Sequence, residues 1–121
     1  MSPRRRAPSN KIPLKDSALQ NSAPVFAALG DATRLRLIAV LCGGGALSIK
    51  QLTAGTEITR QAVTKHLHVL ADAGLVRETK VGREHLWEFE STQMEEALRS
   101  LDVIARQWDY ALSKLKMEVE R

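Results

Sequence analysis

The chain contains few aromatic residues, one cysteine and no long apolar run. Aromatic side chains make up 4% of the 121 residues, so Leu, Val, Ile and Ala must supply most of a core. The single cysteine, Cys42, excludes an internal disulfide and a metal site built from several cysteines. No apolar run approaches the roughly 20 residues that span a bilayer, and residues 1–11 lack the apolar segment of a secretory signal. These absences favour a cytoplasmic protein, and a length of 121 residues predicts a single domain.

The sequence also lacks the residue sets that enzymes use. It shows no Ser/His/Asp set, no paired catalytic carboxylates and no phosphate-binding loop. The glycine run at residues 43–45 lacks the G-x-G-x-x-G spacing and follows a predicted helix, whereas a nucleotide-binding loop follows a strand. We therefore expect a protein that is not an enzyme and that has no cofactor.

Charge is distributed unevenly along the chain, although the net charge is only +4. Residues 1–16 hold five basic residues, one acidic residue and three of the four prolines, which predicts a disordered basic tail. Residues 60–83 hold five basic and two acidic residues, whereas residues 84–121 hold five basic and nine acidic ones. A basic footprint attracts phosphate. The tail either contacts phosphate or only keeps the chain soluble, and both interpretations remain open.

Residues 47–83 predict a helix-turn-helix followed by a hairpin. Ser48 and Gln51 have the spacing of a capping box at the start of a short helix, which Gly55 ends. Thr59 is the expected N-cap of a second helix, over residues 60–73, which stops at Gly74. The turn between the two helices is about four residues long, as a helix-turn-helix requires. Strands are expected at residues 75–80 and 84–90, with a turn at 81–83.

Two further helices are expected before this motif. The first covers about residues 17–29 and is interrupted or restarted at Pro24. The second covers residues 32–42, with Asp31 as its N-cap, and the three glycines that follow end it. The predicted fold is mainly α with a small β-hairpin, a winged helix-turn-helix over residues 17–121 that dimerises through its terminal helices.

The helix at residues 60–73 has one apolar face and one polar, basic face. At about 100° per residue, Val63, Leu67 and Leu70 point inward. The outward residues supply donors for base edges and phosphates. The alternative is an ordinary solvated helix face beside a plain exposed turn. The candidate DNA-binding residues are Thr59, Arg60, Gln61, Thr64, Lys65 and His68 on this helix, Lys80 and Arg83 at the hairpin tip, and Lys50 on the preceding helix.

The C-terminal segment predicts one long helix, over about residues 92–119, with Thr92 and Glu95 as a capping box. Its apolar positions are spaced 4, 3, 4, 3, 4, 3 and 4 residues apart from Met94 to Val119, which is a heptad pattern. Such a helix forms a dimer interface, or it covers only the core of its own subunit. The candidate interface residues are Leu98, Leu101, Ile104, Ala105, Trp108, Leu112 and Leu115.

Three coupled segments resemble the ArsR/SmtB family of winged-helix repressors over roughly residues 22–91. They read ALGDATRLRLIAVL, LSIKQLTAGTEITRQAVTKHLHVLADAGLV and VGREHLWEF. The resemblance implies a homodimer that binds a palindromic operator and represses transcription. By position, the DNA-reading residues of the family fall on Arg60, Gln61, Thr64 and Lys65, with the wing at residues 80–83.

The metal-binding patterns of that family are missing. One of its sites uses a Cys-x-Cys pair on the first helix of the motif, where this chain reads IKQLTAGTE. Another uses Asp and His on the terminal helix, which here contains Asp102 and Asp109 but no histidine. His66 and His68 point in different directions on their helix, and Cys42 is expected to be a small, at least half-buried side chain.

We therefore predict a metal-independent, DNA-binding regulator that is active as a homodimer. The alternative is a dimeric protein-interaction module whose winged helix is not used for DNA.

Overall fold

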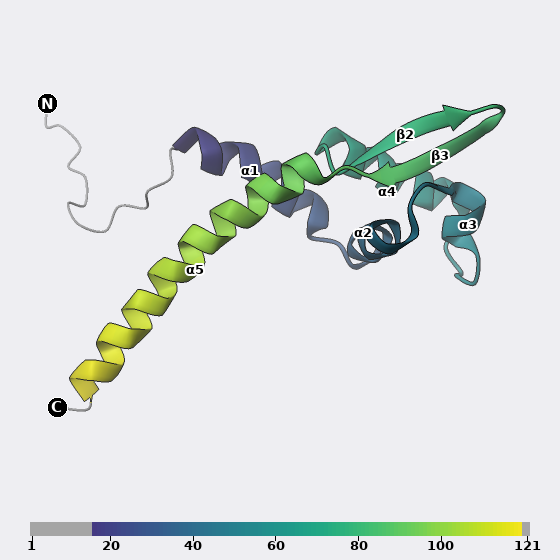
Figure 1. Cartoon of the computed structure of the whole chain (residues 1–121). Coiled ribbons are helices and arrows are strands. Elements are labelled where there is room, and N and C mark those ends of the chain that lie inside the picture. Colours follow the sequence, from purple (N-terminus) through teal and green to yellow (C-terminus); the bar gives the residue numbers. More distant parts are fainter. Residues whose placement is uncertain (1–15, 120–121) are drawn as a thin grey trace, which may run out of the picture.

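The computed structural model in Figure 1 describes residues 16–119, in which a small globular part continues into one long protruding helix. The expected mainly α fold with a small sheet is confirmed. The predicted tail, residues 1–16, lies outside the described residues except for Asp16, where the first helix begins. The elements are α1 (Asp16–Leu29), α2 (Ala32–Gly44), β1 (Leu47–Ser48), α3 (Ile49–Thr53), α4 (Arg60–Asp72), β2 (Val76–Val81), β3 (Glu84–Phe89) and α5 (Ser91–Val119).

The sheet has three antiparallel strands in the order β1-β3-β2. The strand β1 was not expected from the sequence, because it has only two residues and exists through its pairing of Leu47 with Trp87. Strands β2 and β3 form the predicted hairpin around Gly82, whose φ of 62° suits a glycine. The third strand fixes the base of the hairpin on the helical part, which a two-stranded hairpin needs for stability.

The core is aliphatic, as the scarcity of aromatic residues predicted. Its buried side chains come from all five helices and from the hairpin, where Trp87 is buried and the half-buried Phe89 packs against the core. Each fully buried Leu or Val contributes about 1.5–3 kcal/mol relative to an exposed one. The largest of these side chains are Leu41, Leu67, Leu70, Leu75, Val25 and Val63.

Three predicted helix caps are confirmed. The Asp31 carboxylate accepts hydrogen bonds from the backbone amides of Thr33 and Arg34, at 2.9 and 3.1 Å. Ser48 and Gln51 form a complete capping box. The Thr59 hydroxyl accepts from the backbone amide of Ala62 at 3.1 Å. These caps satisfy amide groups that a helix leaves unpaired in its first turn.

Two expectations about helix boundaries were wrong. Helix α1 continues through Pro24 without a break, because Val25 and Ala28 lie on its buried face and their packing offsets the cost of the proline. Helix α5 begins at Ser91, and Thr92 and Glu95 form no capping box there. Instead, the Thr92 hydroxyl donates to the carboxylate of Glu90 at 3.1 Å, because that carboxylate already lies at the start of the helix.

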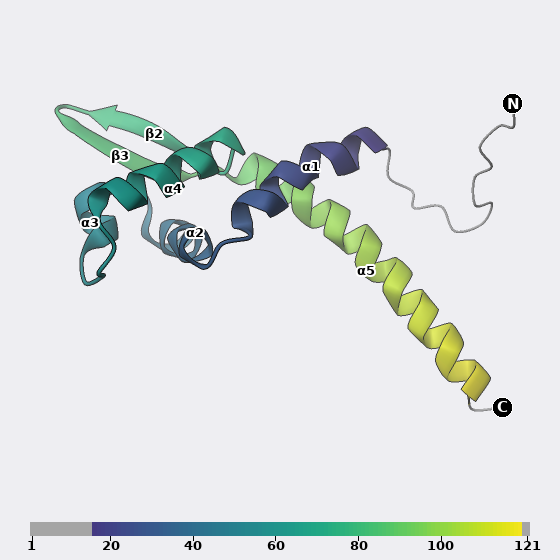
Figure 2. The same ribbon diagram turned by 180° about the vertical axis from the view of Figure 1, so that it is seen from behind.

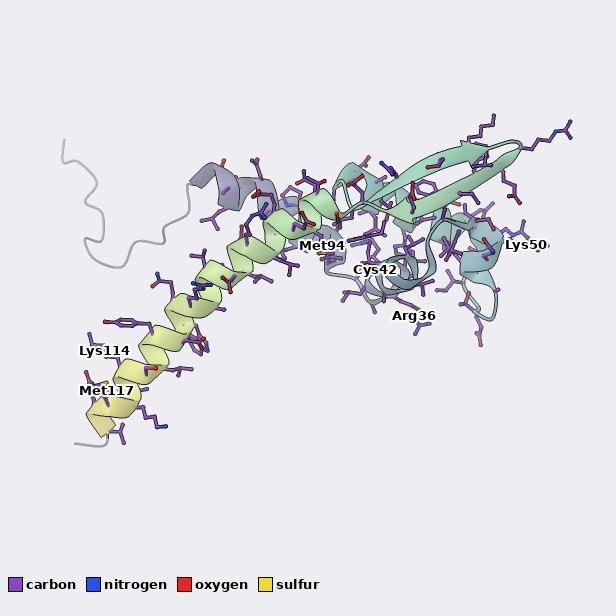
Figure 3. The ribbon with its side chains drawn as sticks, viewed as in Figure 1. Arg36, Cys42, Lys50, Met94, Lys114 and Met117 are labelled. Atoms are coloured by element: carbon purple, nitrogen blue, oxygen red, sulfur yellow. The ribbon has the colours of Figure 1, made fainter. Side chains whose placement is uncertain are left out.

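Helix α2 and its cysteine also differ from expectation. The helix extends through two of the three glycines and ends at Gly44, with Gly45, whose φ is 73°, as its C-cap. Cys42 is exposed, not buried, because it lies on the outer side of α2, away from the buried Leu37, Ile38 and Leu41. Figure 3 shows Cys42 together with Arg36 on this helix.

Helix α1 packs beside the beginning of α5, which Figure 2 shows from behind. The contact buries Ala97 and Ser100, and the hydroxyls of Ser22 and Ser100 form a buried hydrogen bond of 3.0 Å. Gly74, with a φ of 79°, ends the α4 segment so close to α5 that an added Cβ would lie 2.6 Å from Cγ of Gln93. These contacts hold the first turns of α5 against the globular part.

The cap at Asp31 makes stability depend on pH. The hydrogen bond from the Arg34 amide is the main cause that holds the pKa of Asp31 below its ordinary value of 3.8, and the charges of Arg34 and His66 act in the same direction. The stabilisation is therefore complete above pH 3.8 and is lost as the pH falls through the lower folded-state pKa.

Replacing Asp31→Ala should lower the free energy of unfolding at neutral pH, and the difference from wild type should shrink in acid. Urea unfolding measured stepwise from pH 7 to pH 3 would show this. Asp31→Asn is the matched control, because it keeps an N-cap acceptor without a titrating charge. A difference between wild type and Asp31→Ala that does not change with pH would contradict the role of the charge.

Candidate nucleic-acid interface

Helices α3 and α4 form a helix-turn-helix whose second helix is fixed by its inner face. Val63, Leu67 and Leu70 are buried, as predicted, and α4 contacts α2, α3 and β2. Both ribbon views show α4 beside the hairpin. Because one side of α4 is held in the core, the opposite side is presented to solvent as a rigid surface.

The first two turns of α4 carry the exposed polar groups. Arg60, Gln61 and Lys65 are exposed. Of the ion pairs formed within residues 16–119, none includes Arg60 or Lys65. Their positive charges are therefore available to an external anion. The N-terminal turns of a recognition helix are also the part that contacts base edges in the major groove.

Two candidate threonines already have local hydrogen bonds. The Thr64 hydroxyl donates to the backbone carbonyl of Arg60 at 2.8 Å, and its side chain is half-buried. The Thr59 hydroxyl accepts from the helix it caps. Each oxygen keeps unused hydrogen-bonding capacity, and the methyl group of Thr64 is suited to contact a thymine methyl. We therefore expect a smaller contribution from these threonines than from Arg60 and Gln61.

His68 lies between α4 and the sheet. Its ring is 5.8 Å from the ring of Trp87, centroid to centroid, at an interplanar angle of 45°. His68 remains exposed, whereas Trp87 is 3% exposed and its Nε1 atom has no hydrogen-bond partner within the described chain. The contact connects α4 directly to β3. The sequence did not reveal it, because pairing across elements depends on the folded arrangement.

The flank of α4 opposite His68 is held at the junction of α1 and α2. His66 is half-buried, with its Nδ1 atom 3.3 Å from Nη1 of Arg34 and 3.9 Å from the carboxylate of Asp31. The same carboxylate caps α2. The contacts of His66 and His68 therefore lie on two flanks of the helix and limit its rotation.

The hairpin separates its paired charges from its basic tip. Arg77 on β2 bonds Glu88 at 2.9 Å and Glu90 at 3.2 Å, and His85 lies 2.7 Å from Glu78. These pairs leave Lys80 and Arg83 exposed near the turn, outside the ion pairs of residues 16–119, with Glu84 as the nearby acid. The tip is therefore a small basic surface at the end of a stiff hairpin whose strands carry paired charges.

Lys50 completes the set of predicted basic residues. It is exposed on α3, and Figure 3 shows it pointing outward at the end of the molecule that also carries the hairpin tip. The fold thus brings the candidate residues of α3, α4 and the hairpin to one end of the globular part. That arrangement suits a DNA duplex, because one helix can enter the groove while the basic side chains on either side of it contact phosphates.

Neither a metal-ligand cluster nor a membrane-spanning helix is found in this part of the chain. Within residues 16–119, no three His, Cys, Asp or Glu side chains lie close enough together to hold a metal ion. No helix in the same range is long and apolar enough to cross a membrane.

The chain is similar to known regulators over most of its length. A helix-turn-helix domain family matches residues 29–79. The uncharacterized HTH-type transcriptional regulator YuzN of Bacillus subtilis is 35% identical in an alignment 85 residues long that covers 65% of this chain and 92% of that protein. An arsenical resistance operon repressor of the same species is 36% identical over 67 residues, 54% of this chain and 64% of that protein. The structure of an ArsR-like transcriptional regulator from Rhodococcus sp. RHA1 superposes with a TM-score of 0.70 at 35% identity, covering 84% of this chain and 94% of that one.

Lys80 at the hairpin tip is expected to contact phosphate. Lys80→Ala should weaken DNA binding by a similar factor on every sequence and reduce the slope of log affinity against log salt concentration by about one per subunit. Titrations by fluorescence anisotropy at several salt concentrations would measure this. Lys114→Ala is the matched control, since Lys114 is exposed at the far end of α5. If the two variants have the same slope, the wing tip does not contact the backbone.

Proposed function

Because the chain belongs to the ArsR family of winged helix-turn-helix transcriptional regulators, which bind DNA and are not enzymes, we propose that it is a homodimeric repressor. In this proposal each subunit reads one half of a palindromic operator. A DNA ligand also favours the compartment that contains the DNA, which is the cytoplasm in the bacteria from which the relatives above come.

One observation supports the DNA-reading role most directly. Helix α4 buries its three inner side chains completely, and it presents Arg60, Gln61 and Lys65 to solvent outside the ion pairs of the described chain. An arginine and a glutamine in the first turn match the bidentate edges of guanine and adenine. We propose that Arg60 and Gln61 read bases. The residues that contact the DNA backbone, or support those that do, are Lys65, His68, Lys80, Arg83 and Lys50. A protein-interaction module would not require this polar, basic face.

Arg60→Ala tests the reading role. If Arg60 binds guanine edges, the variant should lose about 1–3 kcal/mol of binding free energy on the preferred operator and discriminate less at one base pair of each half-site. Selection of binding sites from random DNA gives the operator, and mobility-shift titration on matched and mismatched sites gives the affinities. Unchanged affinity and unchanged discrimination would remove Arg60 from the reading surface.

The dimer is proposed because α5 carries apolar side chains that its own subunit does not cover. Leu98, Leu101 and Leu115 are 55%, 46% and 58% exposed. Ile104, Trp108 and Leu112 are also exposed, and Ala105 lies between them. Exposed apolar surface in a continuous patch marks an interaction site. The alternative is that α5 covers only the core of its own subunit. That alternative explains the apolar residues in the first turns of α5 but not the exposed apolar residues further along.

Leu101→Asp tests the dimer interface, because it places a carboxylate where two apolar helices would meet. Analytical ultracentrifugation should show a monomer, and operator affinity should fall sharply because each subunit then binds one half-site alone. Tyr110→Asp is the matched control, since Tyr110 is exposed on the opposite side of α5. A Leu101→Asp protein that remains a dimer would overturn this assignment of the interface.

The repressor role follows the name of the arsenical resistance relative, whereas the metal ligands expected in metal-sensing members are missing here. We propose that DNA binding by this chain needs no metal. Isothermal titration calorimetry with zinc should show no stoichiometric submicromolar site. Operator affinity should also be the same with and without a chelator, and a change on chelation would contradict metal independence.

A further inference from the structure

We propose that the uncharged imidazole of His66 holds α4 in its DNA-binding orientation, and that acid weakens DNA binding by protonating this ring. His66 is a positioning residue in this proposal, because it lies on a flank of α4 and not on the face that presents Arg60 and Gln61. The inference rests on the proposed DNA-reading role of α4 and adds a way in which that role is regulated. It follows from the contacts of His66 with α2 and from the donors and acceptors that these contacts require.

The side chain of Arg34 joins three helices at the point where α1 ends and α2 begins. Its Nε atom donates to the backbone carbonyl of Ala28 in α1 at 2.5 Å, and its Nη1 atom lies 3.3 Å from Nδ1 of His66 in α4. Helices α1, α2 and α4 also contact one another in pairs, and Figure 2 shows the three from behind. The same α1 packs against α5, where Ser22 bonds Ser100. Arg34 and His66 therefore connect α4 to the α1–α5 side of the molecule.

The contact with Arg34 requires one protonation state of His66. An arginine guanidinium has only donors, so Nδ1 of His66 must be the acceptor, and the ring is then neutral with its proton on Nε2. A proton on Nδ1 would remove the acceptor and place two positive charges side by side. Histidine is the side chain that ordinarily changes charge between pH 5 and pH 8. The side chain of His66 is 25% exposed, so protons from solvent reach it.

The carboxylate of Asp31 offers the protonated ring a different partner. Its Oδ2 atom lies 3.9 Å from Nδ1 of His66, and the same oxygen accepts the hydrogen bonds from the amides of Thr33 and Arg34 that cap α2. A charged imidazole is repelled by the guanidinium and attracted by this carboxylate. Protonation therefore exchanges Arg34 for Asp31 as the partner of His66, and α4 loses the hydrogen bond that fixed this flank.

Asp31 and Arg34, both at the start of α2, are the charged groups that contact His66 within residues 16–119. In the same range, no ion pair connects His66 to α1, α3 or β2, which α4 also contacts. On α4 itself, the residues three and four positions away are uncharged: Ala62, Val63, Val69 and Leu70.

The other two histidines act on DNA affinity with the opposite sign. His68 lies on the candidate DNA-binding face and His85 on the hairpin, where an added proton increases the attraction for phosphate. The effect of His66 must therefore be measured as a difference between variants at each pH, not as the pH profile of the unsubstituted chain alone.

Two replacements of His66 separate its acceptor from its charge. Asparagine keeps an acceptor oxygen at the position of Nδ1, has a similar helix propensity and does not titrate, whereas leucine fills the space without an acceptor. The operator comes from selection on random DNA. Its affinity for the full chain is measured by fluorescence anisotropy from about pH 8 to about pH 5.5 at constant ionic strength, across the range in which histidine titrates. Urea unfolding of each variant shows that it is folded at each pH.

At the alkaline end, His66→Leu should bind the operator about 3- to 10-fold more weakly than wild type, the range expected for one hydrogen bond. His66→Asn should restore most of this affinity. At the acidic end, His66→Asn should bind more tightly than wild type by a factor in the same range, because only wild type loses its acceptor there. His85→Asn is the matched control, the same replacement at a histidine that pairs with Glu78 on the hairpin, and it should show no such gain in acid.

Each other result would overturn the inference in a recognisable way. A folded His66→Leu protein with wild-type affinity at the alkaline end means that the imidazole does not position α4. If the ratio of His66→Asn to wild-type affinity is the same at every pH, protonation of His66 does not weaken binding, and this comparison decides the matter even where His66→Leu fails to fold. In both cases, loss of operator affinity in Arg60→Ala shows that the proposed function stands. An unsubstituted chain that selects no DNA sequence removes the proposed function, and this inference with it.

Discussion

The burial of the inner face of α4 is the contact on which the rest of the molecule depends. Val63, Leu67 and Leu70 anchor the helix in an aliphatic core that includes parts of α1, α2 and the sheet. Without that contact the polar side of α4 would have no defined direction. Contacts on its flanks, from His66 to the α1–α2 junction and from His68 to Trp87, then restrict how the helix can turn. The candidate DNA-binding surface is rigid because its reverse side is packed.

Helix α5, unlike α4, leaves most of its apolar side chains outside the core of its own subunit. Its first turns are buried through Ala97 and Ser100, with Met94 packed against the core, and the rest of its apolar stripe from Leu98 onward is left outside the core. A subunit of this size has a limited core, and a second copy enlarges the buried surface without adding residues to the chain. In the proposed homodimer, stability of the fold and formation of the DNA-binding pair depend on the same helix.

Most local features were predicted from the sequence and most long-range ones were not. The caps at Asp31, Ser48 and Thr59 were predicted correctly, because a cap depends on residues within one turn, whereas the capping box expected at Thr92 was wrong because its hydroxyl bonds Glu90 instead. The strand β1 was missed, because Leu47 becomes a strand residue only by pairing with Trp87. The break at Pro24 was wrong for a similar reason, since core packing of α1 outweighs the local preference of proline. The candidate DNA face was found by helical periodicity, but the contact of His68 with Trp87 and the local bonds of Thr64 required the folded arrangement.

The positions of the two tryptophans give the protein two separate optical reporters. Trp87 lies 3% exposed in the core beneath His68, so its fluorescence responds to unfolding. Trp108 is 64% exposed on α5, so its emission is that of an indole in water until another surface covers it. Replacing either one by phenylalanine leaves a chain with a single tryptophan. Folding at the reading end and association at the far end can then be followed independently, in the same cuvette and without a label.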